Sequence, residues 1–338
     1  MSGWFRLVGW ALLTVAILLA VAGAAWWWVY REITGAGPLT HARTVIIPTH
    51  SGLDSVADLL TKEGVVRHRV LFEASALLSG DASGLQAGEY EFPVGTSPLE
   101  ASAIIASGKT VKHKLTIPEG LTSAEALALV QAAPALFGPV GAPPPEGSLM
   151  PDTYLYSYGE RRTELIAQMQ REMAHVLAAT WAKRQPDLPL VSPQQMLTLA
   201  SLVESEAAHA DERAHIAGVF INRLRLGMRL ESDSTVSYAL SDSGAKKLDR
   251  PLTRSDLQTL SPYNTYLEAG LPPGPIDNPG VAALRAAARP SPTDDLYFVA
   301  NRNGGHVFAK TLAEHNHNVA QYRHSALVGP DSPGNVAH

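Results

Sequence analysis

Residues 192–206 read Ser-Pro-Gln-Gln-Met-Leu-Thr-Leu-Ala-Ser-Leu-Val-Glu-Ser-Glu. The segment opens like a helix, because Ser192 can cap it, proline fits the first turn, and Gln195 can close a capping box. Apolar residues then recur at helical spacing, which predicts one buried face. We therefore expect a rigid helix here, around which the rest of the chain is organised.

Two glutamates lie at the end of this predicted helix, on opposite edges of its apolar face. Glu204 follows Ala200 by four residues, and Glu206 follows Leu202 by four. A carboxylate held against apolar surface loses hydration, which favours the protonated form that a general acid needs. The same spacing also fits a solvated or ion-paired carboxylate, since charged groups are rarely buried without a partner. Periodicity alone does not choose between the two glutamates.

Several sequence blocks occur in order, beginning within this helix. They are 199–206, 212–213 (Glu-Arg), 217–224 (Ala-Gly-Val-Phe-Ile-Asn-Arg-Leu), 227–228, 233–236 (Asp-Ser-Thr-Val), 261–266 (Ser-Pro-Tyr-Asn-Thr-Tyr), 270–276 (Gly-Leu-Pro-Pro-Gly-Pro-Ile) and 278–280 (Asn-Pro-Gly). Together they resemble the endolytic murein transglycosylase family, the YceG-like proteins, over nearly the whole chain beyond its N-terminal segment. In that family the catalytic acid is the first glutamate of the block that contains Glu204 here. The resemblance therefore assigns that role to Glu204.

Composition narrows the class of protein. A length of 338 residues suggests two or three domains, and 46% hydrophobic residues are ample for packed cores. The net charge of −5 offers no general attraction to nucleic acid, and we expect none to bind. The chain has no cysteine, which excludes disulfides and thiolate sites. His315 and His317 lack metal-ligand spacing, so we expect neither a metal nor a cofactor.

The N-terminal segment predicts a membrane anchor. Residues 7–30 carry no charge and are long enough to cross a hydrocarbon core of about 30 Å. Aromatic residues cluster at the far end of this run, as at a membrane interface: Trp26, Trp27, Trp28 and Tyr30. Ala20-Val21-Ala22 also fits a signal-peptide cleavage site, but the apolar run continues beyond it, which favours an uncleaved helix. The flanking charges barely set the orientation; the resemblance implies a cytoplasmic end at residues 1–6 and a periplasmic body.

We expect an α+β chain with a linker at 31–43, a small domain at 44–110, a catalytic domain at 111–325 and a disordered tail at 326–338. Strand patterns at 44–47 and 86–92 alternate with helix patterns at 51–60, 70–78 and 97–105. Ile47-Pro48 before Gly52-Leu53 is echoed by Ile117-Pro118 before Gly120-Leu121. The resemblance implies that the small domain is a LysM-like glycan-binding fold. The alternative is a scaffold that sets the distance from the membrane.

Beyond Glu204 the pattern predicts a second helix, capped by Asp211 and ended by Gly227, that packs as a hairpin on the first. Asp233 and Thr235 follow in a predicted turn, in which Ser234 stands where family members often have proline. Irregular segments at 261–266 and 270–279 are typical of binding loops. The candidate substrate contacts are Glu206, Asp233, Thr235, Tyr263, Asn264 and Tyr266. We also expect a hairpin at 296–308, turning at Asn303, and a last helix that starts with a capping box at Thr311.

The resemblance implies a membrane-anchored lytic transglycosylase that acts on peptidoglycan glycan strands, leaves 1,6-anhydromuramic ends and could terminate strand elongation. Its expected partners are the glycan, the inner membrane and cell-wall synthases such as penicillin-binding proteins. A hydrolytic muramidase is the nearest alternative, with Asp233 or Glu206 as the second carboxylate. A catalytically silent peptidoglycan-binding anchor is the alternative from another class. A glutamate kept at the edge of an apolar helix face disfavours it, because an unpaired buried charge is costly without a role.

Overall fold

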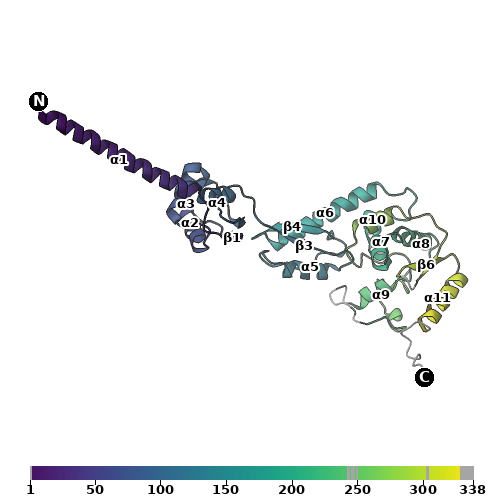
Figure 1. Cartoon of the computed structure of the whole chain (residues 1–338). Helices are drawn as coiled ribbons and strands as arrows, with labels where there is room; N and C mark the ends of the chain where they lie inside the picture. Colours follow the sequence, from purple (N-terminus) through teal and green to yellow (C-terminus); the bar gives the residue numbers. More distant parts are fainter. Residues whose placement is uncertain (1, 242–243, 245–247, 249, 302–303, 328–338) are drawn as a thin grey trace, which may run out of the picture. The chain divides into compact units, whose positions relative to one another are not determined.

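The computed structural model describes residues 2–241, 244, 248, 250–301 and 304–327. The chain is a mixed α+β protein whose elements are shown in Figure 1. It divides into two compact units, Met1–His113 with Leu155–Glu160, and Lys114–Tyr154 with Arg161–His338. The helix that carries Glu204 belongs to the second unit.

The N-terminal helix α1 (Ser2–Thr34) contains a stretch, Leu7–Thr34, that is long and apolar enough to cross a membrane. None of its most hydropathic window is buried, as expected for a single-pass anchor. The helix continues four residues beyond the expected end at residue 30. Its last turn is held because Ile33 is only 6% exposed and the Gly35 N–H donates to the Arg31 carbonyl at 2.8 Å.

The first unit builds a core from a strand–helix–helix–strand sequence. Its elements are β1 (Arg43–Ile47), α2 (Leu53–Lys62), α3 (Arg69–Ser79), a short 3-10 turn η1 (Asp81–Ser83), β2 (Gly88–Phe92) and α4 (Pro98–Ala106). β1 and β2 pair antiparallel, with Val45 opposite Tyr90. Alternate strand residues point to one face, so Val45, Tyr90 and Phe92 are buried against the helices. Each of these helices lies within about two residues of its predicted position.

A short two-stranded sheet of β3 (Lys112–Thr116) and β4 (Thr153–Ser157) follows. α5 (Ser123–Ala132) then starts with a capping box, in which the Thr122 hydroxyl accepts from the Glu125 N–H and the Glu125 carboxylate accepts from the Thr122 N–H. The strand–turn–helix pattern around Pro118 therefore repeats the one around Pro48, as the sequence echo indicates.

The second unit is organised around α7 (Pro193–Glu206), which packs against α6 (Arg162–Ala182), α8 (Arg213–Arg225) and α10 (Val281–Ala288) (Figure 1). The sequence predicted one buried face. Instead, every residue from Met196 to Val203 is buried, because neighbouring helices cover α7 on several sides. The small residues Thr198, Ala200 and Ser201 permit this close packing, and the Ser201 hydroxyl is satisfied by the Thr198 carbonyl at 2.8 Å.

The predicted caps of the two central helices are only partly formed. The Ser192 hydroxyl accepts from the Gln195 N–H at 3.2 Å, but the Gln195 side chain returns to the Val191 N–H rather than to Ser192. Asp211 does not cap α8: the helix begins after Glu212, without a side-chain cap. Glu212 instead accepts from the backbone and the ring of His306, both at 2.8 Å. A distant partner has replaced the local cap.

The predicted turn at 231–235 is wrong, because α9 (Asp233–Leu240) begins there. The 3-10 turn η2 (Asp256–Gln258) follows. The predicted hairpin is formed by antiparallel β5 (Tyr297–Ala300) and β6 (His306–Ala309), and α11 (Leu312–Leu327) is the last helix. Asn303 in the predicted connection and residues 328–338 of the predicted tail lie outside the described residues. Gly227, at a φ of +65°, ends α8 as predicted.

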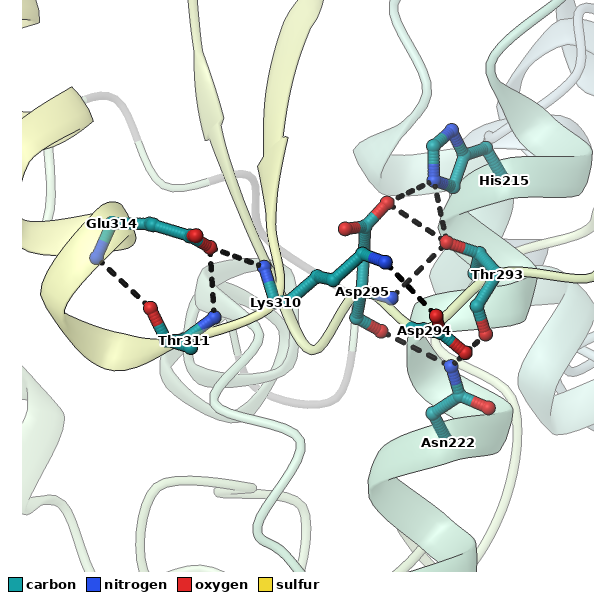
Figure 2. A network of polar contacts seen from close by, with 8 residues as sticks. All are labelled: His215, Asn222, Thr293, Asp294, Asp295, Lys310, Thr311 and Glu314. Atoms are coloured by element: carbon teal, nitrogen blue, oxygen red, sulfur yellow. Dashed lines mark hydrogen bonds and ion pairs between the residues drawn. The ribbon is translucent and has the colours of Figure 1, made fainter.

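Polar contacts tie α8 to the segment before the hairpin (Figure 2). The His215 ring lies 2.8 Å from the Asp295 carboxylate, and the Asn222 amide donates to the Thr293 carbonyl at 2.8 Å. Lys310 pairs with Asp294 at 2.9 Å. These contacts fix α8, and with it the residue at its start, Arg213.

Candidate active site

Glu204 lies in the last turn of α7 and is almost fully enclosed. Its Oε1 accepts from Arg213 Nη2 at 2.9 Å, and its Oε2 accepts from the Gly280 backbone N–H at 3.0 Å. Only 6% of the side chain is exposed. The carboxylate thus accepts hydrogen bonds from one cation at the start of α8 and from one backbone N–H in the segment before α10. The sequence also allowed an ion-paired carboxylate at this position, and that is what the structure shows.

Arg213 is shared with a second carboxylate, Glu119. The distance from Arg213 Nη2 to Glu119 Oε2 is 3.6 Å, and the Glu119 side chain is 44% exposed. Partial burial and the negative charge of Glu204 raise the pKa of Glu119, and Arg213 lowers it. The sequence analysis did not select Glu119, although it stands inside the repeated Pro-to-Gly motif at Pro118 and Gly120.

The Glu119 carboxylate packs against Gly280, which has no side chain. A Cβ built on Gly280 would lie 1.7 Å from Glu119 Oε1, so any side chain would displace that carboxylate. The absence of a Cβ leaves room for the Glu119 carboxylate beside Gly280, whose N–H donates to Glu204.

The loop before Gly280 is fixed by Asn278, which is fully buried. Its side-chain carbonyl accepts from the Leu149 N–H at 2.9 Å, and its amide donates to the Leu121 carbonyl at 2.9 Å. The Ile276 N–H donates to the Ser201 hydroxyl on α7 at 3.1 Å. Three separate segments therefore determine where the Gly280 donor lies.

Asp277 is a buried carboxyl that the sequence analysis missed. It is 2% exposed, and its Oδ2 accepts from the Ser205 hydroxyl at 2.5 Å. Burial raises the pKa of Asp277 well above its usual value, and the negative charges of Glu204 and Glu146 raise it further. Burial therefore favours the protonated form of Asp277. Among the described residues, its Oδ1 has no hydrogen-bond partner.

Ser205 and Asp277 line a hollow of about 360 Å³ in the second unit. Its walls come from the segment after β3, the end of α7, the start of α9 and the loop before α10, and include Gly120, Ser234, Tyr238 and Ile276. Glu204 is the neighbour of Ser205 in α7, and its Cγ lies 3.7 Å from a Cβ built on Gly120. The candidate acid thus lies beside this hollow, next to two residues of its lining, Ser205 and Gly120.

Glu206 faces different partners. Its Oε1 accepts from the Ser232 hydroxyl at 2.6 Å and from the Ser234 hydroxyl at 3.0 Å. Burial raises the pKa of Glu206, while the two hydroxyls lower it. The departure from proline at position 234 thus supplies one of the hydroxyls that hold Glu206.

The remaining predicted contacts divide into two groups. Asp233 accepts from the Tyr266 hydroxyl at 2.6 Å, and the Tyr263 ring lies 4.9 Å from that of Tyr238, which lines the hollow. Thr235 and Asn264 are fully buried instead. The Thr235 hydroxyl donates to the Ser232 carbonyl, and the Asn264 amide donates to two loop carbonyls. In this structure these two side chains hold the loops together.

An α+β unit that presents one glutamate near a buried second carboxyl and a hollow has the groups expected of a protein that cleaves glycosidic bonds. The chain belongs to the YceG-like family, whose model matches residues 45–321.

Similar proteins extend over most of the chain. An endolytic murein transglycosylase of Bacillus subtilis is 34% identical over 304 residues, which cover 80% of this chain and 82% of that protein. One from Streptococcus pneumoniae strain D39 is 31% identical over 333 residues, and the match spans 59% of its length and 84% of this chain. The crystal structure of a putative yceG-like protein from Listeria monocytogenes has a TM-score of 0.51 and 31% identity, covering 82% of this chain and 99% of that one.

Proposed function

We propose that this protein is an endolytic lytic transglycosylase of peptidoglycan, with Glu204 as its catalytic acid and base. The observation that carries the proposal is the position of Glu204, between Arg213 and the Gly280 N–H and next to Ser205, which lines a hollow. The names of the relatives in two bacteria, at 34% and 31% identity, support the same reaction class.

In the first step, protonated Glu204 donates to the oxygen that joins C1 of N-acetylmuramic acid to N-acetylglucosamine. The C1–oxygen bond breaks, its electron pair leaves with that oxygen, and positive charge develops at C1 and the ring oxygen. Glu204 is now an anion. Arg213 and the Gly280 N–H stabilise this anion, because charge-assisted hydrogen bonds are strong where water is excluded.

In the second step, the Glu204 carboxylate accepts the proton of the muramic C6 hydroxyl while O6 forms a bond to C1. The product is a 1,6-anhydro ring, and Glu204 is protonated again for the next cycle. One carboxyl serves both steps because the nucleophile is part of the substrate and is held near C1 by the ring itself.

Asp277 gives the muramidase alternative a new candidate for its second carboxyl. The sequence offered only Asp233 and Glu206, whereas the structure places Asp277 against Ser205, the neighbour of Glu204. A hydrolase needs that group as a base or a nucleophile, and so ionised. Burial raises the pKa of Asp277, which disfavours the ionised form that a hydrolase would need.

Mass analysis of products made from purified murein in oxygen-18 water separates the two reactions. We expect fragments that end in 1,6-anhydromuramic acid and contain no oxygen-18, with only a modest loss of rate for Asp233→Asn. Reducing muramic ends that carry oxygen-18 would instead identify a muramidase. If Asp277→Asn then abolished the labelled product, Asp277 would be its second carboxyl. The absence of any cleavage would support the silent anchor.

We also propose that α1 spans the inner membrane and that the chain beyond it lies in the periplasm, with the LysM-like part of the first unit available to glycan. The apolar stretch Leu7–Thr34 supports the anchor. Protein recovered from membranes is expected to keep its original N-terminus, and protease added to spheroplasts should digest the body. A mature N-terminus near Gly23 would contradict the anchor, and a body protected from protease would contradict the orientation.

A further inference from the structure

A second and larger hollow, of about 640 Å³, lies among α6, α8 and α10 of the same unit. Its apolar lining is made of small and branched side chains, among them Val176, Ala179, Ala214, Val281 and Ala286. The proposed reaction does not use this hollow.

The hollow is adjacent to Glu204. Arg213 lines it and donates to Glu204 Oε1 at 2.9 Å. Val281, also in the lining, directly follows Gly280, whose N–H donates to Glu204 Oε2 at 3.0 Å. A substituent on a sugar bound at Glu204 could therefore enter this hollow at the start of α10.

Three cations gather toward the other end of α10: Lys183, Arg285 and Arg289. The Gln185 N–H donates to the Ala288 carbonyl at 2.9 Å, so the end of α6 that carries Lys183 meets the end of α10 that carries Arg289. Arg285, in the last turn of α10, and Arg289, just beyond its end, both line the hollow. All three side chains are exposed, and the ion pairs found among the described residues include none of them.

The carboxylate in this lining is Glu172, which lies 4.0 Å from His175. Because the lining also holds the three cations and Arg213, its net charge is positive. The helix dipole stabilises cations near helix C-termini, which accounts for each of the three cations taken singly. It does not explain why three from two helices line one hollow next to a glycan-cleaving residue. An anionic ligand does.

We propose that this hollow binds the anionic stem peptide carried on the lactyl group of N-acetylmuramic acid; this inference rests on the proposed function. From Val281 to Arg289 is eight residues of mostly helical chain, about 12 Å. An extended tetrapeptide spans about 13 Å. The apolar floor fits alanine methyl groups, and the three cations fit the carboxylates that stem peptides carry beyond their first residue. The hollow would make stem-bearing strands better substrates than bare ones.

The test compares cleavage of glycan strands that keep their stem peptides with strands stripped by an amidase, using the full-length protein in detergent. The double variant Arg285→Gln/Arg289→Gln is expected to lower kcat/KM on stem-bearing strands roughly tenfold, through KM, because exposed charge pairs are individually weak. Its rate on stripped strands should stay at the wild-type value. Arg171→Gln, an exposed arginine of α6 outside the hollow, is the matched control and should change neither rate.

An equal loss on both substrates would overturn the inference, since it would show that the arginines act through the structure of the catalytic site. If the double variant lost activity on neither substrate, the inference would be overturned as well. In either case, cleavage of stripped strands by the wild type would still support the proposed function. If the wild type cleaved neither substrate, the proposed function would fail and the stem-peptide site with it.

Discussion

Glu204 and Glu206 are two residues apart on one helix, yet their surroundings differ in kind. Glu204 has a full positive charge from Arg213 and a backbone donor from Gly280. Glu206 has two neutral hydroxyls, from Ser232 and Ser234, and burial raises its pKa. About 200° of helical rotation separates the two side chains, so they meet different loops.

Burial does not single out the glutamate that the family resemblance assigns as the acid, because both side chains are largely enclosed. Glu206 is the glutamate whose pKa burial raises, as a general acid is expected to show. Glu204 instead has groups that stabilise its anion, and a residue that must act as an acid and then as a base needs such groups after the first step. The comparison teaches that the partners of a carboxylate, as well as its burial, bear on its role.

The largest expected effect tests this comparison directly. Glu204→Gln should fold normally and lose murein cleavage by at least about 10²–10⁴-fold, because general acid and base catalysis alone has that value. Glu206→Gln should keep turnover within about tenfold, since glutamine can still accept from Ser232 and Ser234. Product release from labelled murein measures both. Near-normal turnover of Glu204→Gln, with loss in Glu206→Gln, would reverse the assignment.

A smaller effect is expected at Arg213, the group that distinguishes the two surroundings. Arg213→Gln removes the charge beside the Glu204 anion and should lower kcat about 10–100-fold, the value of one hydrogen bond to a charged group. Arg213→Lys keeps the charge and should lose less. Steady-state rates on murein, with melting temperatures to confirm folding, make the comparison. Equal losses in the two variants would show that guanidinium geometry, and not charge, is what the site needs.

The smallest effect concerns stability. Burial raises the pKa of Glu146 to about 7, and its Oε2 accepts from the Ser123 N–H at 2.8 Å. A carboxyl whose pKa is raised by folding stabilises the protein below its unfolded pKa and loses that contribution as pH rises toward 7. Above pH 7, Glu146→Gln should therefore have a free energy of unfolding about 1–2 kcal/mol larger than that of the wild type, after allowance for solvent, and should melt at a higher temperature. Both differences should shrink toward pH 4.5. Paired melting curves measure it, and a difference that does not vary with pH would refute the linkage.

Local sequence signals predicted elements well where their partners were local. The Thr311 hydroxyl accepts from the Glu314 N–H, as the capping box predicted, and the alternation at residues 88–92 placed β2 correctly. The prediction of a cap at Asp211 failed. The helix α8 begins after Glu212, and the Glu212 carboxylate accepts hydrogen bonds from His306 in the hairpin. The turn predicted at Asp233 failed as well, because the helix α9 begins there.

The same division holds for the candidate site. The sequence by itself determined the central helix, the apolar N-terminal stretch and, through the order of its motifs, the family, and the family resemblance led to the proposal of Glu204 as the acid. Only the tertiary structure decided that Arg213, Glu119 and the Gly280 N–H meet at that carboxylate, that Asp277 is a buried neighbour of Ser205, and that Asn264 is enclosed. The physical reason is sequence separation: Asp277 and Gly280 lie more than seventy residues beyond α7, and no periodic pattern records which distant loop reaches a given helix end.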